Sequence, residues 1–369
     1  MHMVRNVHNV SMDVYSFPPN NDFESVAVLK KLAQAHRYLA ELKGLARSIP
    51  NEGILIDTLT LQEAKDSSEV ENIVTTHDEL FKASAGDLRG TPAAKEVRDY
   101  SAATKLGFSK VRKTGLLRLN DILEIQAVIK RNNVGLRRLP GTALKNSDTG
   151  EVVYEPPQNP EDIVELMGEL VKYINAPTDN GLDPLIRMAL MHHQFESIHP
   201  FYDGNGRVGR ILNILYLVMH KLLDIPILYL SRHITSNKNE YYRLLQLVRD
   251  TGAWDEWVIY ILDGVESTAK ETIDLVQEIK VLMMSAKRKI RTEAPKIYSQ
   301  DLLNNLFRHP YTKIAYLMED VGVTRMTATK YLEELVEKGV LNKQKIGRDN
   351  YYINVALCEI LIRSSARYE

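Results

Sequence analysis

The spacing of apolar residues predicts a mainly α-helical chain. Apolar positions recur three and four residues apart over residues 23–39, 93–108 and 119–130, which is the period of a helix with one buried face. A continuous apolar strip over Val265–Leu282 predicts a long helix at about 264–289, separate from an apolar helix that begins at Trp254. This strip either packs on the core or pairs with a second subunit, so a homodimer stays open.

Two local signals refine this helical pattern. Thr60-Leu61-Gln62-Glu63 has the spacing of a capping box, so a helix is predicted to begin at Thr60 and to reach about residue 76. Residues 135–157 are rich in Gly, Pro, Asn and β-branched residues instead. There, the apolar runs Thr142–Leu144 and Val152–Tyr154 flank a polar turn, and this order predicts a β-hairpin.

A change of pattern after Glu293-Ala294-Pro295 marks a domain boundary. Beyond it, three helices are predicted at 299–308, 313–320 and 324–338, followed by two strands at 341–345 and 351–355. Three helices and a two-stranded wing are typical of a winged-helix domain, which often binds DNA through its third helix. The domains predicted for the whole chain are an N-terminal helical region at 1–110, a central domain at 111–294 and a winged-helix-like domain at 295–369.

The charge of this C-terminal region weighs against DNA binding without excluding it. The basic residues that would reach phosphates are Arg325, Lys330, Lys343, Lys345 and Arg348. From residue 299 onward, however, ten Lys or Arg stand against nine Asp or Glu, and three glutamates crowd the third helix. A phosphate-binding face is expected to be more basic. A protein-interaction or packing role is therefore favoured, and DNA stays a weaker alternative.

Composition changes the picture mainly by exclusion. Lys plus Arg number 47 and Asp plus Glu 48 in 369 residues, so no overall charge marks a nucleic-acid or membrane-surface protein. Cys358 is the single cysteine, which excludes an intramolecular disulfide framework and fits a reducing cytoplasm. Residues 1 to about 20 are predicted to form an irregular leader without the apolar core of a signal peptide. No apolar run reaches the roughly 18 residues of a membrane span, so a cytoplasmic protein without a membrane partner is expected.

The strongest chemical signal is the stretch His-Pro-Phe-Tyr-Asp-Gly-Asn-Gly-Arg-Val-Gly-Arg at residues 199–210. It joins two predicted helices, the first of which begins at Asp183-Pro184. Gly204 and Gly206 permit backbone conformations closed to other residues, so that successive N–H groups converge on an anion at a helix N-terminus. The loop therefore has the chemistry of a phosphate site.

The charged residues of the same stretch extend this interpretation to a polyphosphate with a metal ion. Arg207 and Arg210 lie on one helical face, Asp203 is the nearest carboxylate able to hold Mg²⁺, and His199 is placed to take a proton from a hydroxyl. Phe201 more plausibly anchors the loop in the core. Taken singly, such residues are usually structural, since Asn-Gly is a common turn dipeptide. Together they are hard to explain as packing, and they fit neither a P-loop nor a dinucleotide-binding loop.

These twelve residues match His-x-Phe-x-Asp/Glu-Gly-Asn-Gly-Arg-x-x-Arg at every defined position, and the chain thereby resembles the Fic family over about residues 60–267. The resemblance implies a helical bundle that transfers AMP from ATP to a hydroxyl side chain (Ser, Thr or Tyr) of a target protein and releases pyrophosphate. It implies that His199 is the catalytic base, that Asp203 holds Mg²⁺ and that Phe201 positions the loop. It assigns ATP binding to Gly204, Asn205, Gly206, Arg207, Val208, Gly209, Arg210 and Tyr242.

The resemblance also implies self-inhibition. Residues 67–72 match the Ser/Thr-x-x-x-Glu-Gly/Asn pattern of an inhibitory helix found in one class of Fic proteins, and the matching residues are Ser67, Glu71 and Asn72. Taken alone, Glu71 is better explained as a solvated carboxylate on a helix surface. In the Fic arrangement it pairs with Arg210 and occupies donors that the ATP γ-phosphate needs. An enzyme in a largely self-inhibited state is therefore expected.

Two further features follow from the same similarity. The hairpin, at about 137–157, resembles the Fic flap that holds a target segment by strand-like pairing, which reads little side-chain sequence. Tyr242 and, more weakly, Asn237 are placed near the adenine pocket, although an aromatic in such a stripe is usually core. Two alternatives stay open: a DNA-binding regulator that uses the Fic unit as a nucleotide sensor, and a Fic enzyme that removes AMP.

Overall fold

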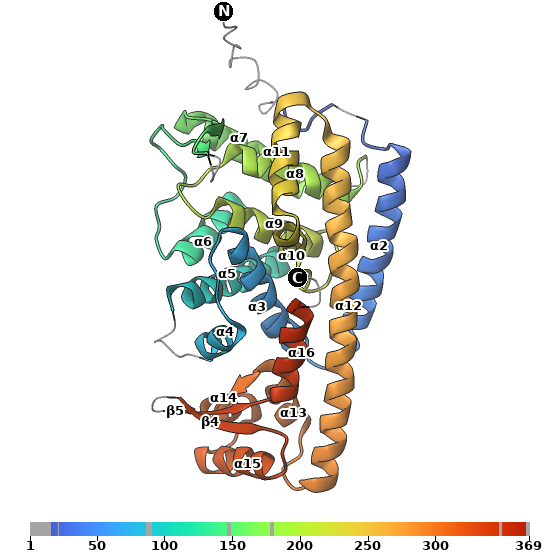
Figure 1. Ribbon diagram of the computed structural model, residues 1–369, viewed down its shortest axis with the longest axis vertical. Coiled ribbons are helices and arrows are strands. Elements are labelled where there is room, and N and C mark those ends of the chain that lie inside the picture. Colours follow the sequence, from blue (N-terminus) through green and yellow to red (C-terminus); the bar gives the residue numbers. More distant parts are fainter. Residues whose placement is uncertain are drawn as a thin grey trace, which may run out of the picture. The chain divides into compact units, whose positions relative to one another are not determined.

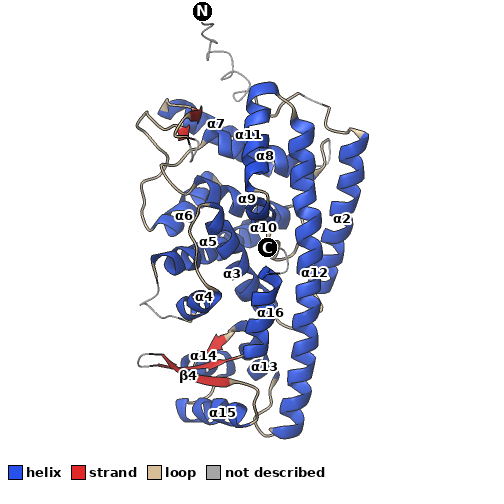
Figure 2. Ribbon diagram, viewed as in Figure 1, coloured by secondary structure: helices blue, strands red, loops and turns tan. Residues whose placement is uncertain are grey.

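The computed structural model describes residues 16–20, 22–85, 91–145, 149–177, 181–346 and 349–366, and helices make up most of them (Figure 1, Figure 2). The predicted mainly α-helical fold class is thus confirmed. Parts of three predictions lie outside the described residues, namely leader residues 1–15, hairpin-turn residues 146–148 and Arg348 of the wing. None of the helices in this described part combines the length and hydropathy that a membrane span requires.

The chain divides into two compact units, and each is described by itself. The first comprises residues 1–39, 102–226 and 230–267, and the second comprises 40–101, 227–229 and 268–369. The division falls inside the helices α2 (Val26–Ala46), α5 (Pro92–Thr114) and α12 (Trp254–Glu293). Wholly within the first unit are α6 (Leu119–Lys130), β1 (Leu144–Lys145), β2 (Val152–Tyr154), α7 (Pro160–Asn175), α8 (Pro184–Ile198), α9 (Asn205–Met219), α10 (Leu230–Ser236) and α11 (Lys238–Thr251).

Helix α8 lies in the core of the first unit. All of its residues from Leu185 to Ile198 are buried, and it packs against α7 and α9. The Asp183 side chain accepts a hydrogen bond from the Leu185 N–H at 2.8 Å, and Pro184 occupies the first turn, as predicted. Because α9 is also largely buried, the loop between the two helices is held by packed structure at both ends.

The short strands β1 and β2 confirm the predicted hairpin. They pair antiparallel, with Leu144 opposite Tyr154. Val152 and Val153 are about half exposed. Since each strand of a two-stranded sheet has one edge without a ladder partner, the hairpin presents main-chain donors and acceptors along with this apolar surface.

The prediction of two separate helices after Trp254 is wrong, because α12 runs without a break for 40 residues. Gly264, where the second helix was expected to begin, lies inside α12. A Cβ at Gly264 would stand 2.9 Å from both His233 Cδ2 and Leu230 Cδ1 of α10. The glycine therefore serves close packing of two helices rather than a helix end.

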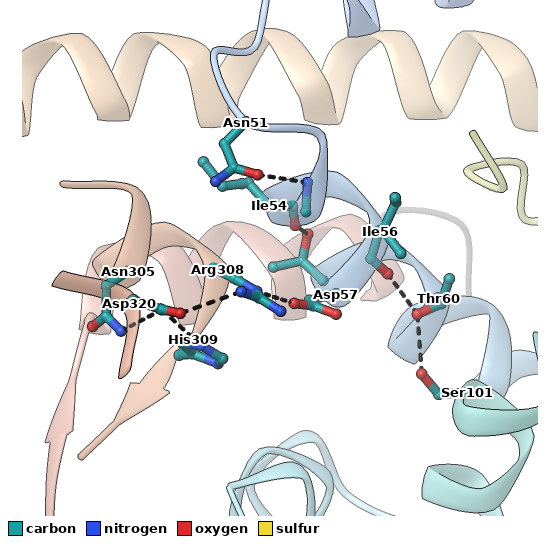
Figure 3. Close-up of polar contacts among 12 residues, drawn as sticks. Asn51, Ile54, Ile56, Asp57, Thr60, Ser101, Asn305, Arg308, His309 and Asp320 are labelled. Atoms are coloured by element: carbon teal, nitrogen blue, oxygen red, sulfur yellow. Dashed lines mark hydrogen bonds and ion pairs between the residues drawn. The ribbon is translucent and has the colours of Figure 1, made fainter. Parts of the chain in front are cut away.

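The predicted helix start at Thr60 is also wrong. Helix α3 (Glu52–Val70) begins earlier, where the Asn51 side chain accepts a hydrogen bond from the Gly53 N–H at 2.8 Å (Figure 3). The Thr60 hydroxyl instead donates to the Ile56 carbonyl at 2.6 Å and lies 3.0 Å from the Ser101 hydroxyl (Figure 3). A threonine in a helix interior makes such a bond to the preceding turn, which the capping-box spacing cannot reveal.

The C-terminal part of the second unit contains the predicted three helices and wing. Its three-stranded sheet has the order β3 (Tyr311–Thr312), β5 (Asp349–Ile353) and β4 (Asn342–Ile346). Ser299 and Thr324 cap the first and third helices through their side chains. Strand β3 and the final helix α16 were not predicted, because β3 has two residues and α16 lies beyond the wing. The elements wholly within the second unit are α3, α4 (His77–Ser84), α13 (Gln300–Arg308), β3 (Tyr311–Thr312), α14 (Ile314–Val321), α15 (Arg325–Glu337), β4 (Asn342–Ile346), β5 (Asp349–Ile353) and α16 (Val355–Ala366).

Arg308 joins α3 to this C-terminal region by an ion-pair network. Its Nε donates to Asp57 of α3 at 2.5 Å, and its NH1 donates to Asp320 at 3.3 Å (Figure 3). Asp320 in turn accepts from Asn305 at 2.8 Å and lies 3.3 Å from His309 Nε2. Two segments far apart in the sequence are thereby held together within one unit.

We expect Arg308→Ala to lower the free energy of unfolding by about 1 kcal/mol, because two partly buried carboxylates lose their shared cation. Urea titrations at low and high salt would measure the loss, which should shrink as salt screens the network. Arg363→Ala is the matched control, since Arg363 makes one ion pair with Glu278 and is more exposed. An equal loss of unfolding free energy in both variants would mean that the network stabilises the fold no more than a single exposed ion pair does.

Candidate active site

The motif loop begins at a residue held in an uncommon backbone conformation. His199 follows the last residue of α8 with φ 47° and ψ 59°, in the left-handed region that few residues other than glycine adopt. Its N–H donates to the Phe195 carbonyl at 3.0 Å, so the turn at the end of the helix is hydrogen-bonded. A non-glycine residue in this region is typical of a functional site, where the surrounding structure holds the strain.

Asn205 fixes the other side of the loop. Its Oδ1 accepts from the Phe201 N–H at 2.8 Å and its Nδ2 donates to the Phe201 carbonyl at 2.7 Å. Phe201 is fully buried, with its ring centroid 6.3 Å from that of Phe195. The buried ring agrees with the anchoring role expected for Phe201. The Asn205 side chain is engaged by the loop, which leaves its backbone N–H as the group for the predicted phosphate contact.

Helix α9 presents its N-terminus directly after the loop. Gly204 is the N-cap residue with φ 86°, a conformation that favours glycine. Gly206 lies in the first turn of α9 with helical geometry, so the expectation that both glycines need special conformations is wrong for Gly206. The first N–H groups of any helix lack intrahelical partners, and together with the helix dipole they favour an anion.

The two motif arginines are buried, whereas the motif carboxylate is exposed. Arg207 and Arg210 are 2% and 1% exposed, and the Asp203 side chain is 62% exposed. Asp203 lies 2.5 Å from Lys130 Nζ and 3.8 Å from Arg207 NH2, so the structure brings the predicted metal ligand and one predicted phosphate ligand together. Gln126 adds a hydrogen bond to the Asp203 carbonyl at 3.4 Å.

A magnesium ion fits this arrangement of one exposed carboxylate beside a helix N-terminus. Mg²⁺ keeps several waters and is usually held by one or two carboxylates together with substrate phosphates. Among the residues that the structure describes, no three His, Cys, Asp or Glu side chains cluster as an all-protein metal site. A site that depends on the nucleotide phosphates is therefore the kind that Asp203 can complete.

Val208 and Gly209 face the packed side of α9. Val208 is fully buried, and a Cβ at Gly209 would stand 2.6 Å from Glu196 Oε1 and 3.0 Å from Phe195 Cδ1 of α8. Gly209 thus lets α8 and α9 approach closely. The assignment of Val208 and Gly209 to ATP binding stays a prediction.

A buried aromatic cluster connects α8 with α11 and α12. His192 Nε2 and the Tyr241 hydroxyl are 2.8 Å apart, and both rings lie within 6 Å of the Trp257 ring. Tyr242, predicted to lie near adenine, is 46% exposed beside Tyr241, with ring centroids 5.2 Å apart. Asn237 is the N-cap residue of α11, and its Nδ2 donates to the His233 carbonyl at 3.1 Å. Tyr242 therefore offers an accessible aromatic surface, and its role with adenine stays a prediction.

We expect stability to fall as the pH drops from 6.5 toward 3, because burial lowers the pKa of His192 and of His193 to about 3. Both imidazoles stay neutral in the folded chain over this range, whereas the unfolded chain protonates them below pH 6.5. Each then contributes a loss of roughly 1.4 kcal/mol per pH unit. Urea unfolding at pH 7 and pH 5 would measure it. His193→Gln should lose about 2 kcal/mol less than the parent between these pH values. An equal loss of stability in the parent and in His193→Gln would contradict the lowered pKa of His193.

Tyr202, which the sequence analysis did not single out, binds the chain segment that enters the hairpin. The Tyr202 hydroxyl, at a variable motif position, accepts from the backbone N–H groups of Arg138 and Leu139 at 2.9 and 3.0 Å. Sequence alone did not identify this contact, because nothing local signals a bond between residues more than 60 positions apart. The chain entering the hairpin is thereby fixed on the motif loop.

The predicted inhibitory residues belong to the second unit, whereas the motif belongs to the first. Ser67 is fully buried in α3. Glu71 is the C-cap residue of α3 and is exposed, and Asn72 follows with φ 60°. The segment is thus the end of α3 and the turn after it, and the helix stops at Val70 rather than continuing to about residue 76.

The C-terminal residues considered for DNA binding include one that is already paired. Lys343 of β4 lies 2.5 Å from Glu333 of α15, which also accepts from the Tyr352 hydroxyl at 2.7 Å. The lysine and the tyrosine hold the pKa of the Glu333 carboxyl below its usual value, so the pair stays charged. The negative charge of Glu333 offsets the positive charge of Lys343, so Lys343 adds little to a phosphate-binding face.

Three family descriptions match the chain. Residues 29–109 match the N-terminal region of the Fic/DOC family, and residues 116–217 match the Fic/DOC family itself. Residues 282–357 match the C-terminal domain of the SoFic-like protein adenylyltransferases. The motif loop lies within the second of these matches.

Curated relatives match a shorter part of the chain. A "Protein adenylyltransferase Fic" from Drosophila mojavensis is 30% identical over 155 residues, which cover 38% of this chain and 29% of that protein. The protein of the same name from Drosophila grimshawi is 31% identical over 135 residues, which cover 35% of this chain and 26% of that protein. The chain thus spans less than a third of the length of these relatives.

Solved structures show the same fold. A Fic family protein from Desulfovibrio desulfuricans has a TM-score of 0.57 and 19% identity, covering 91% of this chain and 98% of that chain. A Fic-domain-containing signaling protein from Bacteroides thetaiotaomicron has a TM-score of 0.53 and 20% identity, covering 67% of this chain and 95% of that one. At this level of identity the likeness concerns the fold alone.

Proposed function

From the premise that this chain carries the Fic/DOC family domains and a SoFic-like C-terminal domain, we propose that it is a protein adenylyltransferase. In this reaction AMP passes from ATP to a Ser, Thr or Tyr hydroxyl of a target protein. The observation that carries the proposal is the complete motif at 199–210, folded as a loop locked by Asn205 between two buried helices. The curated relatives named protein adenylyltransferase Fic support the same activity.

The phosphates of ATP would lie at the N-terminus of α9. Backbone N–H groups of Gly204, Asn205 and Gly206 supply donors there, and Arg207 and Arg210 add guanidinium groups from the same helix. Because both arginines are almost fully buried, they are weakly screened by water and interact strongly with phosphate charge. Asp203 would hold Mg²⁺ beside the phosphates, where the ion would neutralise part of their charge.

The transfer step requires one proton acceptor. The oxygen of the target hydroxyl forms a bond to the α-phosphorus as the bond from that phosphorus to the bridging oxygen of the β-phosphate breaks. Pyrophosphate leaves with the electron pair, and the hydroxyl proton passes to the imidazole of His199. The remaining catalysis is positioning and charge stabilisation by the loop and the two arginines.

The same site is proposed to be self-inhibited. Glu71 would pair with Arg210 and occupy the donors that the γ-phosphate needs, which also places a like charge beside that phosphate. The match of residues 67–72 to the inhibitory pattern supports this step. Removal of AMP by the same site would use the same residues, and the intact motif favours transfer.

The proposal is tested with ATP labelled on the α-phosphate and, in parallel, on the γ-phosphate. The purified Glu71→Gly variant is incubated with Mg²⁺ and each label, and radioactivity on protein is measured. We expect covalent label from the α-position only. Label from the γ-position would indicate a kinase instead, and label from neither position on any added protein would contradict adenylyl transfer.

A further inference from the structure

We propose that Arg137, Tyr154 and Arg249 form a carbonyl clamp that positions the catalytic base against the hairpin, so that they control the transfer rate without contacting ATP. The proposal rests on the proposed function for the identity of the base. Its structural basis is independent of that function. It consists of a set of hydrogen bonds to five consecutive backbone carbonyls, from Glu196 to Pro200.

The bonds cover the whole end of α8 and the first part of the loop. Arg249 donates to the Glu196 carbonyl at 3.2 Å, and the Tyr154 hydroxyl donates to the Ser197 carbonyl at 2.9 Å. Arg137 donates through its guanidinium to the Ile198 and His199 carbonyls at 3.2 and 2.8 Å. The Arg137 backbone N–H donates to the Pro200 carbonyl at 2.9 Å. Every carbonyl that α8 leaves without a partner at this end is therefore bound.

The clamp is buried and charged. Arg137 is 1% exposed and Arg249 is 8% exposed. Burial lowers the pKa of Arg249, but an arginine remains protonated near neutral pH. Cations are stabilised at a helix C-terminus by its partial negative charge, and hydrogen bonds to charged donors are the stronger ones. The negative end of α8 thus stabilises two buried guanidinium groups. Their hydrogen bonds to backbone carbonyls, in turn, fix the backbone at His199.

The clamp contacts the chain segments on both sides of the hairpin, before β1 and after β2. Arg137 lies on the chain that enters the hairpin, and its guanidinium also donates to the Pro157 carbonyl on the chain that leaves it. Tyr154 is the last residue of β2, and the Arg249 guanidinium stacks on its ring at 3.9 Å. One side chain, Arg137, therefore joins three segments: the hairpin entry, the hairpin exit and the base loop.

The hydrogen bonds between the hairpin and the loop would determine how far a target hydroxyl lies from His199. If a target segment pairs with the hairpin edge, the distance from its hydroxyl to His199 is fixed by the position of the hairpin relative to the loop. That position is set by the clamp together with the Tyr202 hydroxyl, which binds the chain entering the hairpin. A misplacement of about 1 Å between reacting groups can lower a rate about 100-fold. The arginines that would hold the phosphates lie on α9 and are not part of the clamp, so ATP binding should be unaffected.

The test uses Arg137→Lys in the Glu71→Gly chain, because lysine keeps the charge but replaces the wide guanidinium fork by one compact ammonium that cannot span the three carbonyls. We expect kcat for AMP transfer to fall about 100-fold while KM for ATP stays within about threefold. Arg187→Lys is the matched control. Arg187 is also a buried arginine that donates to two carbonyls, those of Tyr173 at 2.6 Å and Pro177 at 3.0 Å, but it lies at the opposite end of α8. It should leave kcat within about threefold.

Equal losses of kcat in Arg137→Lys and Arg187→Lys would overturn the proposal, as would a loss of Arg137→Lys that lies entirely in KM for ATP. Tyr154→Phe is the second variant if Arg137→Lys does not fold. It removes a single hydroxyl and keeps the stacked ring, and we expect a fall in kcat of about 10-fold with KM for ATP unchanged.

Hydrogen exchange supplies a readout that needs no activity. In Arg137→Lys, or in Tyr154→Phe, backbone amides of the hairpin and of the loop at 199–204 should exchange faster together, while those of α7 keep the parent rate. Unchanged exchange in the hairpin and loop would overturn the clamp. If none of the chains transfers AMP, the proposed function fails, and the exchange result still decides whether the clamp exists.

Discussion

Replacing His199 by alanine should lower the rate of AMP transfer about 1,000-fold, because the proposed proton acceptor is lost and the Asp203 carboxylate of the same loop is the proposed Mg²⁺ ligand. Both histidine and alanine carry a Cβ, so the left-handed conformation at φ 47° is strained in both, and somewhat more in alanine because histidine is among the residues enriched there. The loop is held by Asn205 and by bonds to its carbonyls, none of which uses the imidazole. The effect should therefore lie in kcat.

The measurement compares initial rates of AMP incorporation and the Kd for ATP in Glu71→Gly and in Glu71→Gly with His199→Ala. The Kd should stay within about threefold, since the proposed phosphate donors are on α9 and at its N-cap. His220→Ala is the matched control, because His220 caps the other end of α9, roughly 22 Å along the helix. A rate of His199→Ala within threefold of the parent would contradict the role of His199 as base.

The parts of the site that sequence predicted are those fixed by local chemistry. The unusual backbone at Gly204, the helix that opens after the loop and the anchoring of Phe201 all follow from residues within a few positions of one another. The same is true of the Asp183-Pro184 start of α8 and of the hairpin. In each case the residue type and its immediate neighbours restrict the backbone to one conformation.

The parts that sequence could not predict depend on distant partners. Arg137 and Arg249 lie 62 and 52 residues from the carbonyl or side-chain groups they bind, and a buried arginine has no local pattern to mark it. Gly264 misled for the same reason, whereas Thr60 misled because its hydroxyl binds the carbonyl four residues earlier. Glycine often ends a helix and threonine often begins one, but here a neighbouring helix and a preceding carbonyl, respectively, decided their roles. Tertiary contacts thus decided the roles of Arg137, Arg249 and Gly264, whereas a bond to the preceding helical turn decided that of Thr60.

Glu71→Gly should raise the rate of AMP transfer by about 10- to 150-fold, which is the effect of removing one strong charge-assisted hydrogen bond from the inhibited state. Glu71 is the C-cap residue of α3 and is exposed, so glycine at this position should cost little stability. On the proposed pairing of Glu71 with Arg210, the gain would arise because the γ-phosphate regains the donors of Arg210. It should therefore appear as tighter, productive ATP binding and a higher rate.

Two variants separate the carboxylate from the backbone. Glu71→Gln keeps the side-chain length and removes the charge, so it should activate less than glycine but more than the parent. Glu69→Gly places the same flexible residue two positions earlier, where Glu69 pairs with Lys65, and should leave the rate unchanged. If the carboxylate acts through Arg210, Glu71→Gly should add nothing to Arg210→Ala, because the two changes remove opposite ends of one interaction. Activation that persists in Arg210→Ala would mean that Glu71 restrains the enzyme through another group.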